Sequence, residues 1–252
     1  MRFFLILLAL VLAIPAAAQI QTDRPSFAMN PYVVQRGTFQ VEAGVPQALR
    51  QRTSVATFDL TQTVYTFSVL ARYGVTETIE ARVSTSVYDL YSLSEDATDT
   101  SESDGNAGFD VITVGAKVQL ATNGPIIAVL PSVSIPTTEG GLVSGGASVI
   151  AGWDLTDALD LTTTLGATLT DTDPDVNVTG IAAAAVGGGL TETVGAFIEL
   201  AAFPSDNVTP IYGGGGLRVL LSPNFQIDGS VDVGLNDEAV DLLFGAGLSA
   251  RF

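Results

Sequence analysis

The sequence predicts an all-β protein, a transmembrane antiparallel up-and-down β-barrel of about 12 strands in the bacterial outer membrane. Three observations predict it: an export signal at the N-terminus, apolar residues that alternate with polar ones, and tight turns that alternate with longer loops. The 252-residue chain is also apolar on average, with a mean hydropathy of +0.40, although its formal charge is -17. A barrel accommodates both properties because apolar side chains face lipid while charges collect in the loops and the lumen.

Residues 1–18 have the plan of a cleaved signal peptide. Arg2 supplies one positive charge, Phe3–Ile14 is an apolar run, and Ala16–Ala18 provides the small residues of a cleavage site. A membrane anchor is the alternative, but a spanning helix needs roughly 20 apolar residues and this run is shorter. We therefore expect export and a mature chain that begins at Gln19.

Alternation with a period of two residues recurs after the signal. In Phe39–Val45, Ile79–Val87 and Phe225–Val233, apolar residues occupy almost every second position, apart from Gly229, as they do in strands with two different faces. We expect residues 19–37 to form a periplasmic N-terminal segment and residues 38–252 to form the barrel. The expected strands lie near 38–48, 62–73, 77–90, 109–121, 125–136, 143–154, 158–170, 177–190, 193–203, 209–221, 224–235 and 239–252.

Tight turns and longer connections alternate between these strands. The tight turns lie near 73–79, 121–125, 154–159, 189–194 and 221–225 and are rich in turn-forming residues. The longer connections are expected at 49–61, 91–108, 137–142, 171–175, 204–208 and 236–238. An even number of strands with both ends on the tight-turn side is typical of outer-membrane barrels, whose short turns are periplasmic. A soluble β-sandwich is the alternative, but it favours neither strands of this length nor an aromatic C-terminal residue.

The last strand indicates which face meets lipid. Its even-numbered residues from Leu242 to Phe252 are apolar, whereas the other face carries Asp241, Ser249 and Arg251. A closing strand that ends on an aromatic residue is typical of the assembly signal of outer-membrane barrels, and we assign this role to Phe252. Expected partners are therefore outer-membrane lipids, lipopolysaccharide and the outer-membrane assembly machinery. The aromatic residues of the outward register near strand ends are either girdle residues or ordinary exposed aromatics; they are Tyr65, Tyr73 and Trp153.

The inward register contains most of the few basic residues. A charge that faces lipid at the membrane midplane costs roughly 2–4 kcal/mol, so these side chains are expected to face the lumen. Two interpretations stay open: a polar path that selects a solute, and a salt-bridge network that fills and braces the barrel. The lumen candidates are Glu42, Arg72, Glu80, Arg82, Lys117, Glu199, Arg218, Asp228, Asp232 and Arg251.

The composition excludes several kinds of chemistry. The chain has no His and no Cys, which removes His-dependent catalysis and zinc–cysteine sites. It has 10 Lys and Arg against 27 Asp and Glu, so nucleic-acid binding is not expected. The acidic residues Asp171, Asp173 and Asp175 lack the Gly and the distal Glu of a calcium loop, which favours a solvated loop. We expect no enzyme activity, no cofactor and no metal site.

Several segments resemble an outer-membrane transporter family labelled "putative meta-pathway of phenol degradation". The segments are Thr22–Phe27, Pro31–Gly44, Leu70–Glu77, Glu80–Arg82, Val114–Lys117 and Ser132–Thr137. The resemblance covers the mature chain loosely and its first half best. It implies an outer-membrane barrel that passes small, often hydrophobic or aromatic, compounds.

A short motif just before the first strand is a candidate plug. We expect Asp23, Arg24 and Pro25 to enter the periplasmic mouth of the barrel. Their expected partners in the wall are Glu42, Arg72, Glu80 or Arg251.

Two functions follow from these patterns. The first is passive diffusion of a small-molecule solute, hydrophobic or aromatic by the family resemblance, through an outer-membrane channel. The alternative is a structural or surface-interaction barrel with a closed, salt-bridged lumen, whose acidic external loops meet ions or partners. Neither function involves nucleic acid.

Overall fold

The computed structural model describes residues 20–55, 58–95, 100–107, 111–122, 124–172 and 174–252. The predicted signal peptide at 1–18 lies outside these residues. In the described ranges, no helix is long and apolar enough to span a membrane. The regular secondary structure consists of strands.

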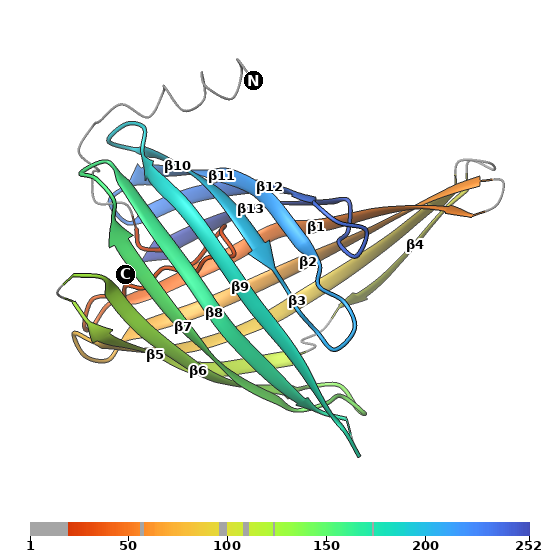
Figure 1. Ribbon diagram of the computed structural model, residues 1–252, viewed down its shortest axis with the longest axis horizontal. Helices are drawn as coiled ribbons and strands as arrows, with labels where there is room; N and C mark the ends of the chain where they lie inside the picture. Colours follow the sequence, from red (N-terminus) through yellow and green to blue (C-terminus); the bar gives the residue numbers. More distant parts are fainter. Residues whose placement is uncertain (1–19, 56–57, 96–99, 108–110, 123, 173) are drawn as a thin grey trace.

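The strands form one antiparallel sheet that closes on itself (Figure 1). β1 pairs with β2 on one side and with β13 on the other, and β2 also pairs with β3. The result is a closed barrel of 12 strands, which confirms the predicted fold class. The strands are β1 (Phe39–Val55), β2 (Phe58–Gly74), β3 (Ile79–Glu95), β4 (Thr100–Ala107), β5 (Val111–Ala121), β6 (Ile126–Pro136), β7 (Ser144–Asp154), β8 (Leu159–Asp171), β9 (Val176–Gly189), β10 (Val194–Ala202), β11 (Ile211–Ser222), β12 (Phe225–Gly234) and β13 (Leu242–Arg251).

Two consecutive strands, β4 and β5, share one position in the wall. β5 pairs with the first part of β3, at Ile79–Thr85, whereas β4 pairs with its last part, at Tyr88–Glu95. β4 therefore extends the sheet beyond the barrel, and it is not one of the 12 strands that close the barrel wall.

The prediction of loops at 49–61 and 91–108 is wrong, because most of these residues are strand. β1, β2 and β3 are each 17 residues long and run past the other strands, with β4 beside β3 (Figure 1). A strand of 17 residues is roughly 56 Å long, and roughly 9–11 residues are enough to cross a membrane. The parts of β1, β2 and β3 that run past the other strands need no face toward lipid. Their sequences therefore lack the apolar alternation on which the strand prediction depended.

Side chains alternate between an apolar outer face and the lumen. Leu165 on β8 is 63% exposed, whereas its neighbour Thr164 points inward and is fully buried. Tyr73 and Trp153, two of the aromatic residues expected near strand ends, are also exposed. The exposed ring of Phe252 lies 6.4 Å from the ring of Phe39 on the adjacent strand. An apolar face around a closed sheet is typical of barrels that lie in a membrane.

Residues 20–37, called the N-terminal segment below, lie at the short-turn end of the barrel. This is the end where β1 begins and β13 finishes (Figure 1). A bridge between Arg36 and Gly74 ties the end of the segment to the rim, and residues 20–34 contact the inner wall. The wall and the segment together form the candidate site.

Candidate functional site

The N-terminal segment crosses the lumen and returns. The backbone oxygen of Gln21 accepts hydrogen bonds from Gln40 on β1 and Arg72 on β2. On the opposite wall, the amide of Met29 donates to Thr164 on β8 at 2.9 Å. The amide of Val34 then donates to Glu80 on β3 at 2.7 Å, close to where the segment began. The segment therefore spans the cross-section of the barrel at this end.

A buried arginine holds two carboxylates on the first three strands. Arg72 donates from Nε and Nη2 to the two oxygens of Glu80, both at 2.8 Å, and from Nη1 to Glu42 at 2.6 Å. The side chains of all three residues are fully buried. The planar guanidinium fits this arrangement because it presents its donors as a fixed fork. Glu42 in turn accepts from the amides of Asp23 and Arg24, so the cluster binds the segment as well as bracing the wall.

Asp23 is the residue of the segment that joins this cluster. Its carboxylate lies 2.5 Å from Arg82 on β3 and 2.9 Å from Lys117 on β5. Burial opposes ionisation of Asp23, but Arg82, Lys117 and Arg72 outweigh burial and hold the pKa of its carboxyl well below the usual value of 3.8. Asp23 is therefore an anion inside the lumen, and it neutralises two cations of the wall.

Arg24 occupies a space that two glycines leave open. Gly44 on β1 and Gly247 on β13 are direct neighbours in the sheet, and a Cβ on either would clash with the guanidinium of Arg24. The guanidinium donates to the backbone oxygen of Ala246 at 2.9 Å and lies 3.5 Å from Asp228 on β12. Glycine is required at both positions because any side chain would occupy the space that the guanidinium of Arg24 fills.

The wall opposite the charged cluster is apolar and aromatic. Phe27 packs against Phe203 and Tyr212, with ring centroids 5.2 and 6.1 Å away. Beside these rings, Glu199 on β10 accepts hydrogen bonds from the hydroxyl of Ser26 at 2.9 Å and from the amide of Phe27 at 2.7 Å. The segment thus forms ion pairs with one wall, and aromatic contacts together with hydrogen bonds to Glu199 on the other.

The structure brings together most of the predicted site residues. Glu42, Arg72, Glu80, Arg82, Lys117, Glu199 and Asp228 contact the segment or each other, as do Asp23 and Arg24. The peptide bond between Arg24 and Pro25 is cis, and Pro25 lines a pocket described below. Arg218 faces inward with its guanidinium over the ring of Phe197, 5.0 Å from the centroid.

Of the alternative partners expected for the plug motif, Glu42 accepts hydrogen bonds from it, whereas Arg251 makes its contacts elsewhere. Arg251 donates to the backbone oxygen of Pro223 at 3.0 Å, at the turn between β11 and β12. It lies next to the chain end, on the rim, where this carbonyl is within reach.

Sequence reasoning missed neutral residues that hold the segment. Gln226 on β12 donates to Thr22 at 3.2 Å, and Thr164 accepts from the segment on the opposite wall. The position of Gln226 was a usable signal, since it is a polar residue between the apolar Phe225 and Ile227, whereas Thr164 follows two other threonines and gave a weaker one. Phe27 gave no such signal, because an isolated aromatic residue in an irregular segment has no predictable direction.

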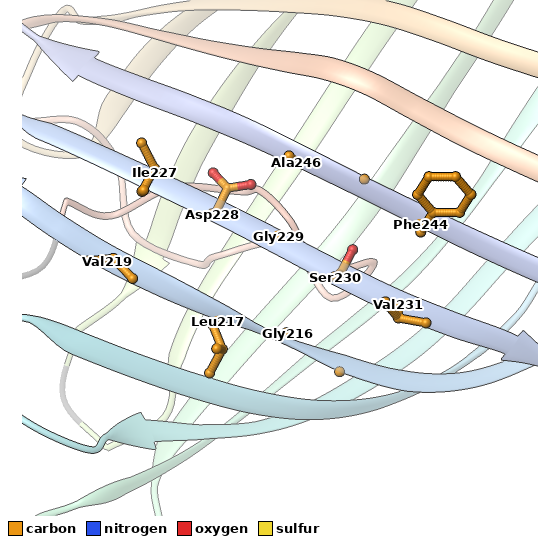
Figure 2. Close-up of a pocket in the computed structure, with 12 residues that line it drawn as sticks. Gly216, Leu217, Val219, Ile227, Asp228, Gly229, Ser230, Val231, Phe244 and Ala246 are labelled. Carbon is orange, nitrogen blue, oxygen red and sulfur yellow. The ribbon is translucent and has the colours of Figure 1, made fainter.

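Two hollows lie near β12, one on each face of the wall. Figure 2 shows the larger, an apolar depression of about 640 Å³ over β11, β12 and β13. Leu217, Ile227 and Val231 are exposed at its edges and Gly229 lies between them, so it belongs to the outer face. The smaller one, about 230 Å³, lies between the segment and the wall and is called the floor pocket below. It is lined by Asp23, Arg24, Pro25, Ser26, Phe27, Met29, Ser230, Asp232, Leu243 and Phe244.

The sequence matches a protein-family model over residues 22–252, which covers the N-terminal segment and the whole barrel. The model describes the "Putative MetA-pathway of phenol degradation" family. The chain belongs to this family. The resemblance that the sequence motifs indicated is therefore confirmed. No match was found among curated proteins.

The fold of this chain is similar to that of solved outer-membrane barrels. An outer membrane channel from Pseudomonas putida F1 is similar with a TM-score of 0.60 and 13% identity, over 90% of this chain and 99% of that chain. The NanC porin is similar with a TM-score of 0.53 and 10% identity, over 85% of this chain and 100% of that chain. The translocator domain of the autotransporter NalP from Neisseria meningitidis is similar with a TM-score of 0.53 and 10% identity, over 87% of this chain and 90% of that chain. Because these barrels serve different purposes, the fold alone does not identify a solute.

Proposed function

We propose that this protein is an outer-membrane channel through which small solutes diffuse passively, and that its N-terminal segment forms the constriction. The observation that carries the proposal is the floor pocket. The segment crosses the lumen at the short-turn end and leaves a hollow of about 230 Å³ against β12 and β13. A barrel whose only task was structural would have no need to keep space between its wall and a tightly hydrogen-bonded segment.

The solutes that we propose are small and in part apolar or aromatic. The family description refers to phenol degradation, and the lumen offers suitable chemistry near the segment. Phe27 lines the floor pocket and packs edge-on against Phe203 and at a tilt against Tyr212. An aromatic solute can pack against such rings while Ser26 and Ser230 offer hydrogen bonds.

A specific observation favours the alternative, a structural barrel with a closed lumen. The side chains of Arg72, Glu42 and Glu80 are fully buried and lie in direct contact, with N–O distances of 2.6 and 2.8 Å. Together with Asp23 and Lys117, they close the part of the cross-section near β1 to β5. If the rest of the cross-section is equally tight in the membrane, the protein braces the membrane or presents its external loops.

Conductance separates the two functions. The chain from Gln19 onward is refolded into planar bilayers and compared with a variant that lacks residues 19–34. The channel function predicts discrete conductance steps for the whole chain and larger steps for the shortened one. The closed-barrel function predicts steps for the shortened variant alone. Swelling of liposomes in phenol, benzyl alcohol and glucose then tests whether aromatic solutes pass preferentially.

The location and partners in this proposal follow from the export signal and the apolar outer face. The protein is exported, loses residues 1–18 and is inserted by the outer-membrane assembly machinery, which recognises Phe252. Outer-membrane lipids and lipopolysaccharide then surround the barrel. No catalytic activity is part of the proposal, since the chain has no His or Cys.

A further inference from the structure

Two buried carboxylates in the described part of the lumen form no ion pair. Asp232 on β12 is 2% exposed and Glu199 on β10 is 7% exposed. In the described part of the chain, Oδ1 of Asp232 and Oε1 of Glu199 lack a hydrogen-bond partner, and neither residue forms an ion pair. The other oxygen of Glu199 accepts from Ser26 and Phe27, but a buried carboxylate oxygen without a partner is costly. The arrangement is therefore that of a site that a positively charged ligand completes.

The two carboxylates flank one glycine. Gly214 on β11 is the sheet neighbour of Glu199 on one side and of Asp232 on the other. A Cβ at Gly214 would clash with Oδ1 of Asp232, so this oxygen lies over the glycine, in the direction of Glu199. Because Gly214 has no side chain, no side chain of β11 separates the carboxylates of Asp232 and Glu199, which lie on the same face of the sheet.

The nearby cations of the protein are engaged elsewhere. Arg24 is held by Asp228 and by the backbone oxygen of Ala246. Arg218 lies over the ring of Phe197 and forms no ion pair with either carboxylate. Neither guanidinium forms an ion pair with Asp232 or Glu199.

The surroundings of Asp232 indicate what kind of cation fits. Asp232 lines the floor pocket, whose other walls include the apolar side chains of Phe27, Met29 and Leu243. At about 230 Å³ this pocket is smaller than the roughly 300–1,000 Å³ typical of drug-sized ligands. Within the described ranges, no three acidic residues form a group that could hold a metal ion, and Ca²⁺ prefers 6–8 oxygen ligands. A small molecule with one positive charge and an apolar body matches both features.

We propose that Asp232 and Glu199 form a lumenal binding site for small primary ammonium compounds with an aromatic or alkyl body. The ammonium group donates to the two free carboxylate oxygens, while the body lies against Phe27 and Leu243. The site gives such cations a preference over neutral and anionic solutes of the same shape. As a statement about transport, this inference rests on the proposed channel function.

Binding is tested without any need for conduction. ¹⁹F NMR follows 4-fluorophenethylammonium added to the whole mature chain refolded in detergent, and 2-(4-fluorophenyl)ethanol serves as the neutral probe. Asp232→Asn is expected to weaken binding of the ammonium probe by at least about tenfold and to leave the alcohol unchanged. Glu192→Gln, the same kind of charge loss in an exposed short turn, is the matched control and is expected to change neither. Equal affinity of the wild type and Asp232→Asn for the ammonium probe would overturn the proposal.

Two further measurements separate the possible failures. In planar bilayers, the permeability ratio of phenethylammonium to chloride is expected to fall in Asp232→Asn. A conducting protein whose ratio is unaffected contradicts the cation site and leaves the channel function intact. A protein that does not conduct, yet loses probe binding in Asp232→Asn, retains the site and contradicts the channel function. Displacement of the probe by an equal concentration of K⁺ would show that the site recognises charge alone and would overturn its preference for organic ammonium compounds.

Discussion

The ammonium group of Lys117 on β5 donates to the carboxylate of Asp23 at 2.9 Å, although 94 positions separate the two residues in the sequence. Lys117 is fully buried, and its second acceptor is the backbone oxygen of Asn30, also in the N-terminal segment. The wall therefore contains a cation whose hydrogen-bond partners come from the segment. Without the segment this charge would face the lumen without these partners, so docking of the segment stabilises the barrel.

Replacement of Arg72 is expected to be the most damaging change in the wall. Arg72→Leu leaves Glu42 and Glu80 buried without their counter-charge, and the loss of one partner of a buried ion pair costs about 3–5 kcal/mol. Urea unfolding of the refolded barrel, followed by its mobility on unheated gels, measures the change. Arg251→Leu is the control: its hydrogen bonds lie at the rim, and we expect a loss of no more than about 1 kcal/mol. Equal losses in the two variants would show that the cluster does not stabilise the barrel.

Docking of the segment is expected to weaken in acid because of Asp23. Its pKa is below 3.8 when the segment is docked and returns to about that value when the segment is released. The released state therefore binds a proton first, so docking is constant above about pH 5 and weakens as the pH falls through 3.8 towards the docked pKa.

The mobility of a spin label measures this release. The chain has no Cys, so Gln21→Cys provides a unique exposed attachment site on the segment. The label is expected to become mobile below pH 4 in the otherwise wild-type protein. In Asp23→Asn it is expected to be more mobile at pH 7 and to show a smaller change in acid. An identical pH profile in both proteins would exclude Asp23 as the group responsible.

The sequence predicted the barrel and much of its inner wall because lipid imposes a strict rule. Every second residue of a membrane strand must be apolar, so the polar residues between them, such as Arg72 and Lys117, have only the lumen to face. The rule fails where both faces are apolar. Ala182, Ala183, Ala184 and Ala185 on β9 carry no alternation, and the sequence does not distinguish the inward Ala183 and Ala185 from their outward neighbours.

The path of the N-terminal segment was beyond sequence reasoning for a related reason. Its order comes from partners far along the chain, such as the hydrogen bond between Ser26 and Glu199, 173 positions apart. An irregular segment has no period from which the direction of a side chain follows. The charges of Asp23 and Arg24 were enough to predict a plug near acidic and basic wall residues, but not that two glycines would receive the guanidinium.

These glycines are expected to control the constriction. In Gly44→Ala, the new Cβ would lie 2.5 Å from Nη1 of Arg24. The guanidinium must therefore move away from Gly44 and lose its contact with Asp228. Overpacking of this kind costs about 1–3 kcal/mol, and we expect the segment to dock less firmly and the conductance to rise. Gly145→Ala is the matched control, since its Cβ would meet only atoms at 3.8 Å or more. A conductance unchanged by Gly44→Ala would show that Arg24 does not hold the constriction.

The aromatic contact on the opposite wall is expected to matter independently of the charges. Phe27→Ala removes the packing against Phe203 and Tyr212. Since Phe27 is only partly buried, we expect the free energy of docking to weaken by about 3 kcal/mol, the lower end of the range for truncation of a buried Phe. Leu165→Ala removes an apolar side chain from the outer face and is expected to leave docking unchanged. Mobility of the label at Gln21→Cys reports both variants at pH 7.

Because the two contacts lie on opposite walls and share no atoms, the effects of Phe27→Ala and Asp23→Asn are expected to add within about 0.5 kcal/mol. A combined effect no larger than that of Asp23→Asn alone would mean that the charged contacts dock the segment by themselves, and that the rings of Phe27, Phe203 and Tyr212 only line the lumen.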